Sequence, residues 1–157
     1  MDTTTTPIPS AAGNLAGENE ALTPILRAGI APTRALSGGR MHLPGATTLA
    51  PQRHDTTETA IAIISGHVAV LSGNAMAPFH PQAGDMIYIP PTLPYAVVNL
   101  SNNASVLALV FRTDPGFDTD VHRMPELDRA ARDQIPGLRR AHHQALLTRR
   151  SGRARRN

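Results

Sequence analysis

Three side chains that can bind metals or transfer protons lie within seven residues of one another. They are Gln52, His54 and Glu58, directly before the apolar segment 59–64. An imidazole, a carboxylate and an amide oxygen suit a borderline or hard divalent cation. Because alternate side chains of a strand share a face, Gln52 and His54 are expected to point the same way. Glu58 follows a short turn at 55–57 and can point back toward the same place.

The same spacing also fits a hydrophilic β-turn that leaves His54 and Glu58 on the surface, and spacing alone favours this plainer interpretation.

Composition excludes other kinds of site. The chain has neither cysteine nor lysine, so thiolate nucleophiles, sulfur-ligated zinc, disulfides and Schiff bases are excluded. It also has no Gly-x-Ser-x-Gly elbow and no phosphate-cradling glycine loop. Basic charge supplied by arginine alone favours a GC-rich bacterial source.

The elements that would position these side chains are short β-prone segments, each closed by Gly, Pro or Asn. They cover residues 40–43, 59–64, 67–71, 86–89, 95–100 and 105–112. Many short strands separated by turn signals predict an all-β sandwich or barrel. After Pro125 the pattern changes to two short helices, over 126–133 and from 137 to about 150.

The chain has 157 residues, enough for one domain with a real core. We expect a disordered N-terminal arm over 1–22, a β-barrel over 23–115, a helical extension over 116–150 and a disordered basic tail over 151–157. The formal charge is +7 from residue 123 onward and −4 before it. The high pI therefore belongs to the tail, and the plainer interpretation is a solvated, solubilising end.

Two motifs in this region resemble those of the cupin superfamily. That family's first motif has a Gly, two His separated by one residue, a Glu three or four residues on, and a closing Gly. The corresponding residues here are Gly45, Gln52, His54, Glu58 and Gly66. The second motif is represented by Gly84, Pro90, Tyr95 and Asn99. The resemblance spans about residues 40–112 and implies a cupin-type double-stranded β-helix, a jelly-roll barrel with a short C-terminal helical extension.

The resemblance also implies a metal centre, which in the family usually has three His and one Glu. Here Gln52 replaces the first His and Tyr95 the His of the second motif, while His54 and Glu58 are kept. The implied cofactor is one divalent ion, zinc, manganese or iron, held by these four residues. In one interpretation Tyr95 is a phenolate ligand or a phenolic acid–base group. In the other the metal has been lost, and Tyr95 hydrogen-bonds Gln52 or Glu58.

Two functions follow from the resemblance. The first is a small metal-dependent enzyme acting on a small organic molecule, with Glu58 or Tyr95 transferring a proton. Isomerase, cyclase or lyase chemistry is favoured over oxygenase chemistry, because redox iron sites usually hold more imidazoles. The alternative is a non-catalytic module that binds or senses a small molecule through a degenerate metal site.

A substrate pocket is expected around Arg40, His42 and Tyr88. Arg40 and His42 share a strand face that could line the mouth of the barrel, although an outward-facing pair is equally compatible with the sequence. Tyr88 could face the interior, and packing explains it equally well.

Partners are indicated by edges and charge. A homodimer is expected through an exposed sheet edge within 23–35. A third hypothesis is a structural dimer whose basic tail docks on an acidic partner. Nucleic acid is not expected as a partner, because the chain has only five aromatic residues.

The sequence shows no signal peptide, and its longest aliphatic run, 60–64, is too short to cross a bilayer. We therefore expect a cytoplasmic protein.

Overall fold

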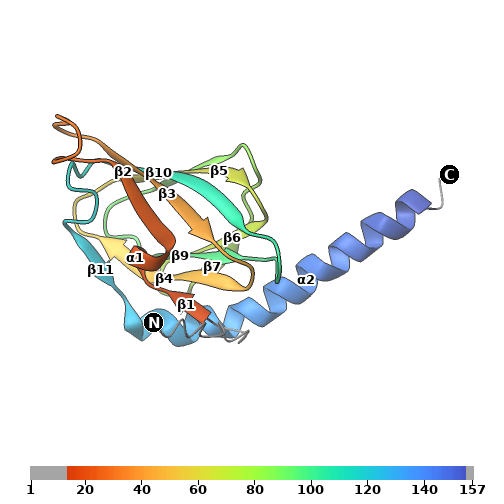
Figure 1. The fold of residues 1–157 in the computed structure, drawn as a ribbon. Coiled ribbons are helices and arrows are strands. Elements are labelled where there is room, and N and C mark those ends of the chain that lie inside the picture. The colour runs from red at the N-terminus through yellow and green to blue at the C-terminus, as the bar shows by residue number, and fades with distance from the viewer. Residues whose placement is uncertain (1–13, 155–157) are drawn as a thin grey trace, which may run out of the picture.

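The computed structural model describes residues 14–154, which form two β-sheets packed face to face and a long C-terminal helix (Figure 1). The strands are β1 (Asn14–Ala16), β2 (Leu22–Leu26), β3 (Ser37–Leu43), β4 (Thr47–His54), β5 (Thr59–Ser65), β6 (Val68–Ser72), β7 (Ala77–Phe79), β8 (Met86–Ile89), β9 (Tyr95–Asn99), β10 (Val106–Arg112) and β11 (Val121–Arg123). The helical elements are α1 (Glu18–Ala21), the 3₁₀ turn η1 (Pro125–Leu127) and α2 (Asp128–Ala154).

Strands that are distant in the sequence lie side by side in both sheets. The six-stranded sheet has the order β1-β4-β9-β6-β7, with β11 also paired to β4. The five-stranded sheet has the order β2-β3-β10-β5-β8. The β1–β4 pair is parallel, and the other pairs, such as β4–β9 and β5–β10, are antiparallel. The predicted all-β jelly roll with a C-terminal helical extension is confirmed.

The strands of the two sheets differ in their pattern of buried and exposed residues, because the sheets differ in how many of their faces are covered. The five-stranded sheet has one buried face, so Val106, Ala108 and Val110 of β10 alternate with more exposed residues. The six-stranded sheet is covered on both faces, so β9 is buried at every position. Its outer face packs against α2, where Ala131 and Ile135 are completely buried.

All six predicted strands are present, but both ends of the chain differ from expectation. Residues 14–26, placed mostly in a disordered arm, form β1, α1 and β2, whereas residues 1–13 lie outside the described part. The two expected helices form one helix, α2, that continues through Pro136 and on through residues 151–154 of the expected tail. Packing of Ile135 against the sheet offsets the helix-breaking tendency of Pro136. Residues 155–157 also lie outside the described part.

Asn99, from the second motif, has a structural role. Its side-chain amide donates to the carbonyl oxygens of Leu43, Pro44 and Ala104 at 2.7–3.1 Å, and its own oxygen accepts from the backbone N–H of Ser101. These bonds tie the end of β9 to the β3–β4 turn.

Within residues 14–154, no helix has the length and apolar character needed to span a membrane.

Candidate functional site

Gln52, His54 and Tyr95 meet inside the barrel. Gln52 and Tyr95 are register partners on β4 and β9, and the Gln52 amide nitrogen donates to the Tyr95 hydroxyl at 3.0 Å. The His54 ring stacks on that of Tyr95 with centroids 6.4 Å apart. Each of the three residues is at most 2 % exposed. The structure thus brings together three of the four residues predicted as metal ligands.

Glu58, the fourth, lies on the outer face of the barrel. It is exposed, and its carboxylate accepts a hydrogen bond from the Tyr88 hydroxyl at 2.8 Å. The reason is the phase of β5, in which Thr59, Ile61 and Ile63 point inward. A carboxylate one residue earlier in that alternation must point outward. Glu58 therefore does not join the other three residues.

The residues expected to line a substrate pocket are also on the outside. Arg40 and His42 are exposed on β3, where Met41 between them is buried, so the outward-facing alternative holds. Tyr88 on β8 is 59 % exposed. These three side chains lie on the solvent face of the five-stranded sheet, and the structure does not bring them to the barrel interior.

The interior contains an ion pair between Arg112 of β10 and Glu18 of α1. The Arg112 side chain is fully buried, and its two terminal nitrogens donate to the Glu18 carboxylate at 2.6 and 3.2 Å. Arg112 also donates to the Phe117 carbonyl at 2.7 Å and lies over the Phe117 ring. The Gln52 amide nitrogen donates to the same carboxylate at 2.8 Å. Glu18 thus inserts a carboxylate next to Gln52 and Tyr95.

His54 forms a dyad with Asp120, which precedes β11. The His54 Nδ1 lies 3.0 Å from an Asp120 oxygen. Burial, reinforced by the charge of Arg112, lowers the pKa of His54. Burial acts to raise the pKa of Asp120, but hydrogen bonds from the Thr56 backbone, His54 and Thr57 outweigh it and hold that pKa well below its usual range. The dyad is therefore a neutral imidazole whose Nδ1–H donates to an ionised carboxylate.

Four buried polar atoms inside the barrel have no hydrogen-bond partner among residues 14–154. They are Ser37 Oγ, His54 Nε2, Thr59 Oγ1 and Arg112 Nε. Thr59 and Arg112 are register partners on β5 and β10. The interior thus has hydrogen-bonding capacity that a small polar ligand could use.

These residues do not fit a divalent metal centre. Within residues 14–154, no group of three His, Cys, Asp or Glu side chains is placed to hold a metal ion. The cluster offers one imidazole nitrogen, and both oxygens of Glu18 are already bound by Arg112. A second cation beside a permanently charged guanidinium would be repelled strongly in a buried site. We therefore assign no metal-dependent step to them.

Tyr95 is a buried, hydrogen-bonded phenol. Burial raises the pKa of Tyr95, although the Arg112 charge acts in the opposite direction, so the phenol stays protonated near neutral pH. Its hydroxyl accepts the hydrogen bond from Gln52 that one of the two interpretations of Tyr95 expects.

Sequence reasoning missed Glu18, Arg112 and Asp120. A signal for Arg112 was present, since it has the same parity as the inward residues Val106, Ala108 and Val110 of its strand. Asp120 and Glu18 carry no such signal. They lie 66 and 34 residues from the β4 side chains that they contact. Glu18 also falls in a segment whose composition predicted disorder.

Comparisons with known proteins identify the fold. No protein-family model and no curated protein matches the sequence. Among solved structures, the chain is similar to a conserved protein with a double-stranded beta-helix domain from Klebsiella pneumoniae, with 18% identity and a TM-score of 0.55 over 65% of this chain and 81% of that one. It is also similar to a cupin protein from Bacteroides fragilis, with 17% identity and a TM-score of 0.52 over 60% and 78% of the two chains.

A further similar structure is the DMSP lyase DddQ from Ruegeria pomeroyi, with 17% identity and a TM-score of 0.55 over 68% of this chain and 53% of that one, so the match spans about half of the lyase. At such identities the likeness concerns the fold, which hosts many unrelated chemistries. The two face-to-face sheets and these neighbours together establish that the chain has the double-stranded β-helix fold, the fold of the cupin proteins to which it is similar.

Proposed function

We propose that the barrel interior binds a small organic carboxylate without a metal, and that Arg112 anchors the carboxylate. The supporting observation is the buried pair between Arg112 and Glu18. A buried guanidinium needs an anionic partner, and its fork matches the two oxygens of a carboxylate. That partner comes from α1, a four-residue helix between two edge strands. Glu18 would then be an internal occupant that a ligand displaces.

The neighbouring polar groups favour a ligand that carries a hydroxyl group as well. Gln52 donates to the carboxylate now in place, and the Thr59 hydroxyl lies on the strand beside Arg112. The unpartnered Nε2 of neutral His54 can accept a hydrogen bond from a ligand hydroxyl. A small hydroxy acid would therefore use groups that the protein itself leaves partly unused.

Exchange of one carboxylate for another keeps the number of ion pairs constant, so affinity depends on competition with Glu18. A tethered group of this kind acts at an effective concentration on the order of millimolar. To displace Glu18, a free carboxylate must be present above this effective concentration or make contacts that Glu18 does not make. We therefore expect weak binding by the wild-type protein and stronger binding once Glu18 has lost its charge.

The test uses lactate and acetate as probes in isothermal titration calorimetry. We expect Glu18→Gln to bind lactate about tenfold more tightly than the wild-type protein, since one charge-assisted competitor is removed. Glu20→Gln is the matched control, because Glu20 is an exposed acid in the same short helix. Adding Arg112→Met to Glu18→Gln should abolish the gain. Equal lactate affinity in the wild-type and Glu18→Gln proteins would rule out the proposal.

A second candidate function is metal-independent proton transfer, favoured by the His54–Asp120 dyad. A neutral imidazole oriented by a carboxylate, with Nε2 unpartnered, is a competent general base. The protonated phenol of Tyr95, stacked beside it, is a suitable acid. This keeps the isomerase, cyclase or lyase class expected from the sequence and moves the base from Glu58, which lies outside, to His54.

Deuterium exchange separates a catalyst from a binder. If the dyad is catalytic, lactate incubated with the Glu18→Gln protein in D₂O should lose its C2 proton signal by NMR. His54→Asn in the same background should stop the exchange while lactate still binds. Binding without exchange would leave the non-catalytic module as the function.

The homodimer and the cytoplasmic location stay predictions. The segment proposed as an edge includes β2, which is the edge of the five-stranded sheet and has exposed Ile25 and Leu26. Pairing of two such edges would bury these side chains. Analytical ultracentrifugation of the wild-type protein and an Ile25→Lys variant should show a dimer only for the former. A monomer in both cases would remove the prediction.

A further inference from the structure

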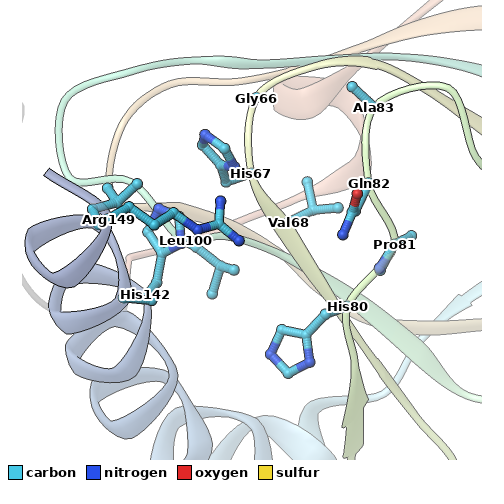
Figure 2. A pocket seen from close by; sticks show the side chains of 12 residues that line it. Gly66, His67, Val68, His80, Pro81, Gln82, Ala83, Leu100, His142 and Arg149 are labelled. Atoms are coloured by element: carbon cyan, nitrogen blue, oxygen red, sulfur yellow. The ribbon is translucent and has the colours of Figure 1, made fainter. Parts of the chain in front are cut away.

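A cavity of about 400 Å³ lies outside the barrel, between α2 and two turns of the sheets (Figure 2). It shares no residue with the interior cluster around Arg112. Residues 66–68 and 80–83 line it together with Leu100, and α2 lines it from another part of the chain. Its lining side chains from α2 are His142, Ala145, Leu146 and Arg149.

The titratable and charged side chains that line this cavity are all basic. They are His67, His80, His142 and Arg149, which come from three separate parts of the chain, and the lining includes no Asp or Glu. The rings of His67 and His142 are in contact, with centroids 4.7 Å apart and planes tilted by 43°. Figure 2 shows the Arg149 side chain extending from the helix toward the turn that carries His67. Such a convergence gives the cavity a positive potential.

The His142 imidazole has a hydrogen-bonding atom that residues 14–154 do not satisfy. Its Nε2 is buried and has no hydrogen-bond partner among them. Burial, together with the positive charges of His67, Arg149, His143 and His80, lowers the pKa of His142. A bound anion would reverse the effect of these neighbours and accept a hydrogen bond from the ring.

Apolar side chains complete the cavity. Val68 belongs to the core between the two sheets, Leu100 belongs to the core between the six-stranded sheet and α2, and Leu146 lines the cavity from α2. The volume is within the range of small-molecule sites, which usually combine apolar walls with a few convergent polar groups. The occupant that fits is therefore an anion attached to a small apolar group.

We propose that this cavity binds a small organic phosphate monoester, with its phosphate between His67, His142 and Arg149 and its apolar part against Val68, Leu100 and Leu146. A phosphate monoester carries nearly two negative charges near neutral pH and three strong acceptor oxygens. It thus matches several convergent cations better than a carboxylate, which carries one charge. Because the bound phosphate favours protonated imidazoles, affinity should rise as the pH falls from about 8 to about 6.

The experiment measures binding of phenyl phosphate, inorganic phosphate and benzoate by calorimetry at pH 6 and pH 8. The full chain is compared with His142→Gln/Arg149→Gln and with the matched variant His143→Gln/Arg150→Gln. His143 and Arg150 are neighbours of the proposed ligands on α2 but do not line this cavity. Phenyl phosphate should bind best, with a Kd that is lower at pH 6 than at pH 8. Its affinity should fall at least about tenfold in the first variant and change less than about twofold in the second.

Four results would overturn the proposal. The first three are benzoate binding as tightly as phenyl phosphate, equal weakening in both double variants, and no pH dependence. The fourth is inorganic phosphate binding as well as phenyl phosphate, which would reject the role of the apolar wall and thus the organic ligand. The lactate experiments on Glu18 and Arg112 are independent, because they concern the barrel interior. Far-UV circular dichroism of both double variants excludes loss of α2 as the cause.

Discussion

Arg112 and Glu18, 94 residues apart in the sequence, form a buried ion pair that joins the N-terminal segment to a central strand of the barrel. The two partners differ in their access to water. The Arg112 side chain is 0 % exposed and that of Glu18 12 %. If Arg112 is removed, Glu18 can turn toward solvent. If the Glu18 charge is removed, the guanidinium stays buried with its charge unbalanced.

This asymmetry predicts the order of two substitutions. Glu18→Gln should lower the free energy of unfolding by about 3–5 kcal/mol, the usual result of leaving a buried charge unpaired. Arg112→Met should cost less, about 1–2 kcal/mol, because an apolar side chain of similar length fills the same space. Urea unfolding of both variants measures the difference. A larger loss in Arg112→Met would mean that Arg112 stabilises the barrel mainly through Phe117.

The His54–Asp120 dyad predicts a pH dependence of stability. The pKa of His54 is lower in the folded protein than its ordinary value of 6.5, so its contribution is present above that value and is lost as the pH falls through the folded pKa. Asp120 also has a lowered folded pKa, so its contribution is present above 3.8 and is lost on further acidification. Stability should therefore fall between pH 7 and pH 5 because of His54, and again below pH 4.

The measurement is the urea midpoint at pH 7.5 and pH 5 for the wild-type protein and for His54→Asn. The variant should show a smaller loss between the two pH values, since the asparagine amide can still donate to Asp120 but does not titrate. His142 also has a lowered pKa, and it is present in both proteins, so it cancels from the comparison. Identical pH profiles would contradict the assignment.

The surroundings of Gly38 and Gly39 on β3 predict different losses of stability for the same substitution. A methyl group at Gly39 would lie 2.7 Å from the Phe117 ring and 2.9 Å from the Thr23 carbonyl, whereas one at Gly38 would make ordinary contacts at 3.5 Å or more. Gly39→Ala should therefore destabilise the protein by about 1–3 kcal/mol through overpacking, and Gly38→Ala by little. Thermal unfolding compares the two. A similar loss in both would show that Phe117 moves easily.

Strand alternation determined how much of this site the sequence could predict. The inward convergence of Gln52, His54 and Tyr95 follows from parity and from the pairing of two motif-bearing strands. The same parity applied to β5 would have placed Glu58 outside. The assignment of Glu58 rested on the short turn at 55–57 and on the family motif, and strand alternation in this chain overrides both.

The remaining interior residues required three-dimensional information. Arg112 could be placed inside by alternation, but its partner could not be identified, because α1 is only four residues long and lies in a segment of low periodicity. Asp120 reaches His54 only because β11 pairs with β4. A three-residue strand such as β11 leaves almost no pattern in a sequence.

Pro136 and Gly137 provide a test of the continuous helix α2. A proline within a helix removes one backbone hydrogen bond and costs about 3 kcal/mol, and a glycine costs about 1 kcal/mol relative to alanine. Pro136→Ala and Gly137→Ala should therefore each raise the free energy of unfolding, since Pro136 is exposed and a methyl group at Gly137 would be no closer than 3.9 Å to the nearest atom. If the segment instead formed two helices separated at this point, proline would suit the start of the second helix, and Pro136→Ala would destabilise the protein. Urea unfolding of the Pro136→Ala and Gly137→Ala variants distinguishes these two cases. The Ile135→Ala variant serves as a reference for the loss of free energy when the contact between α2 and the sheet is removed.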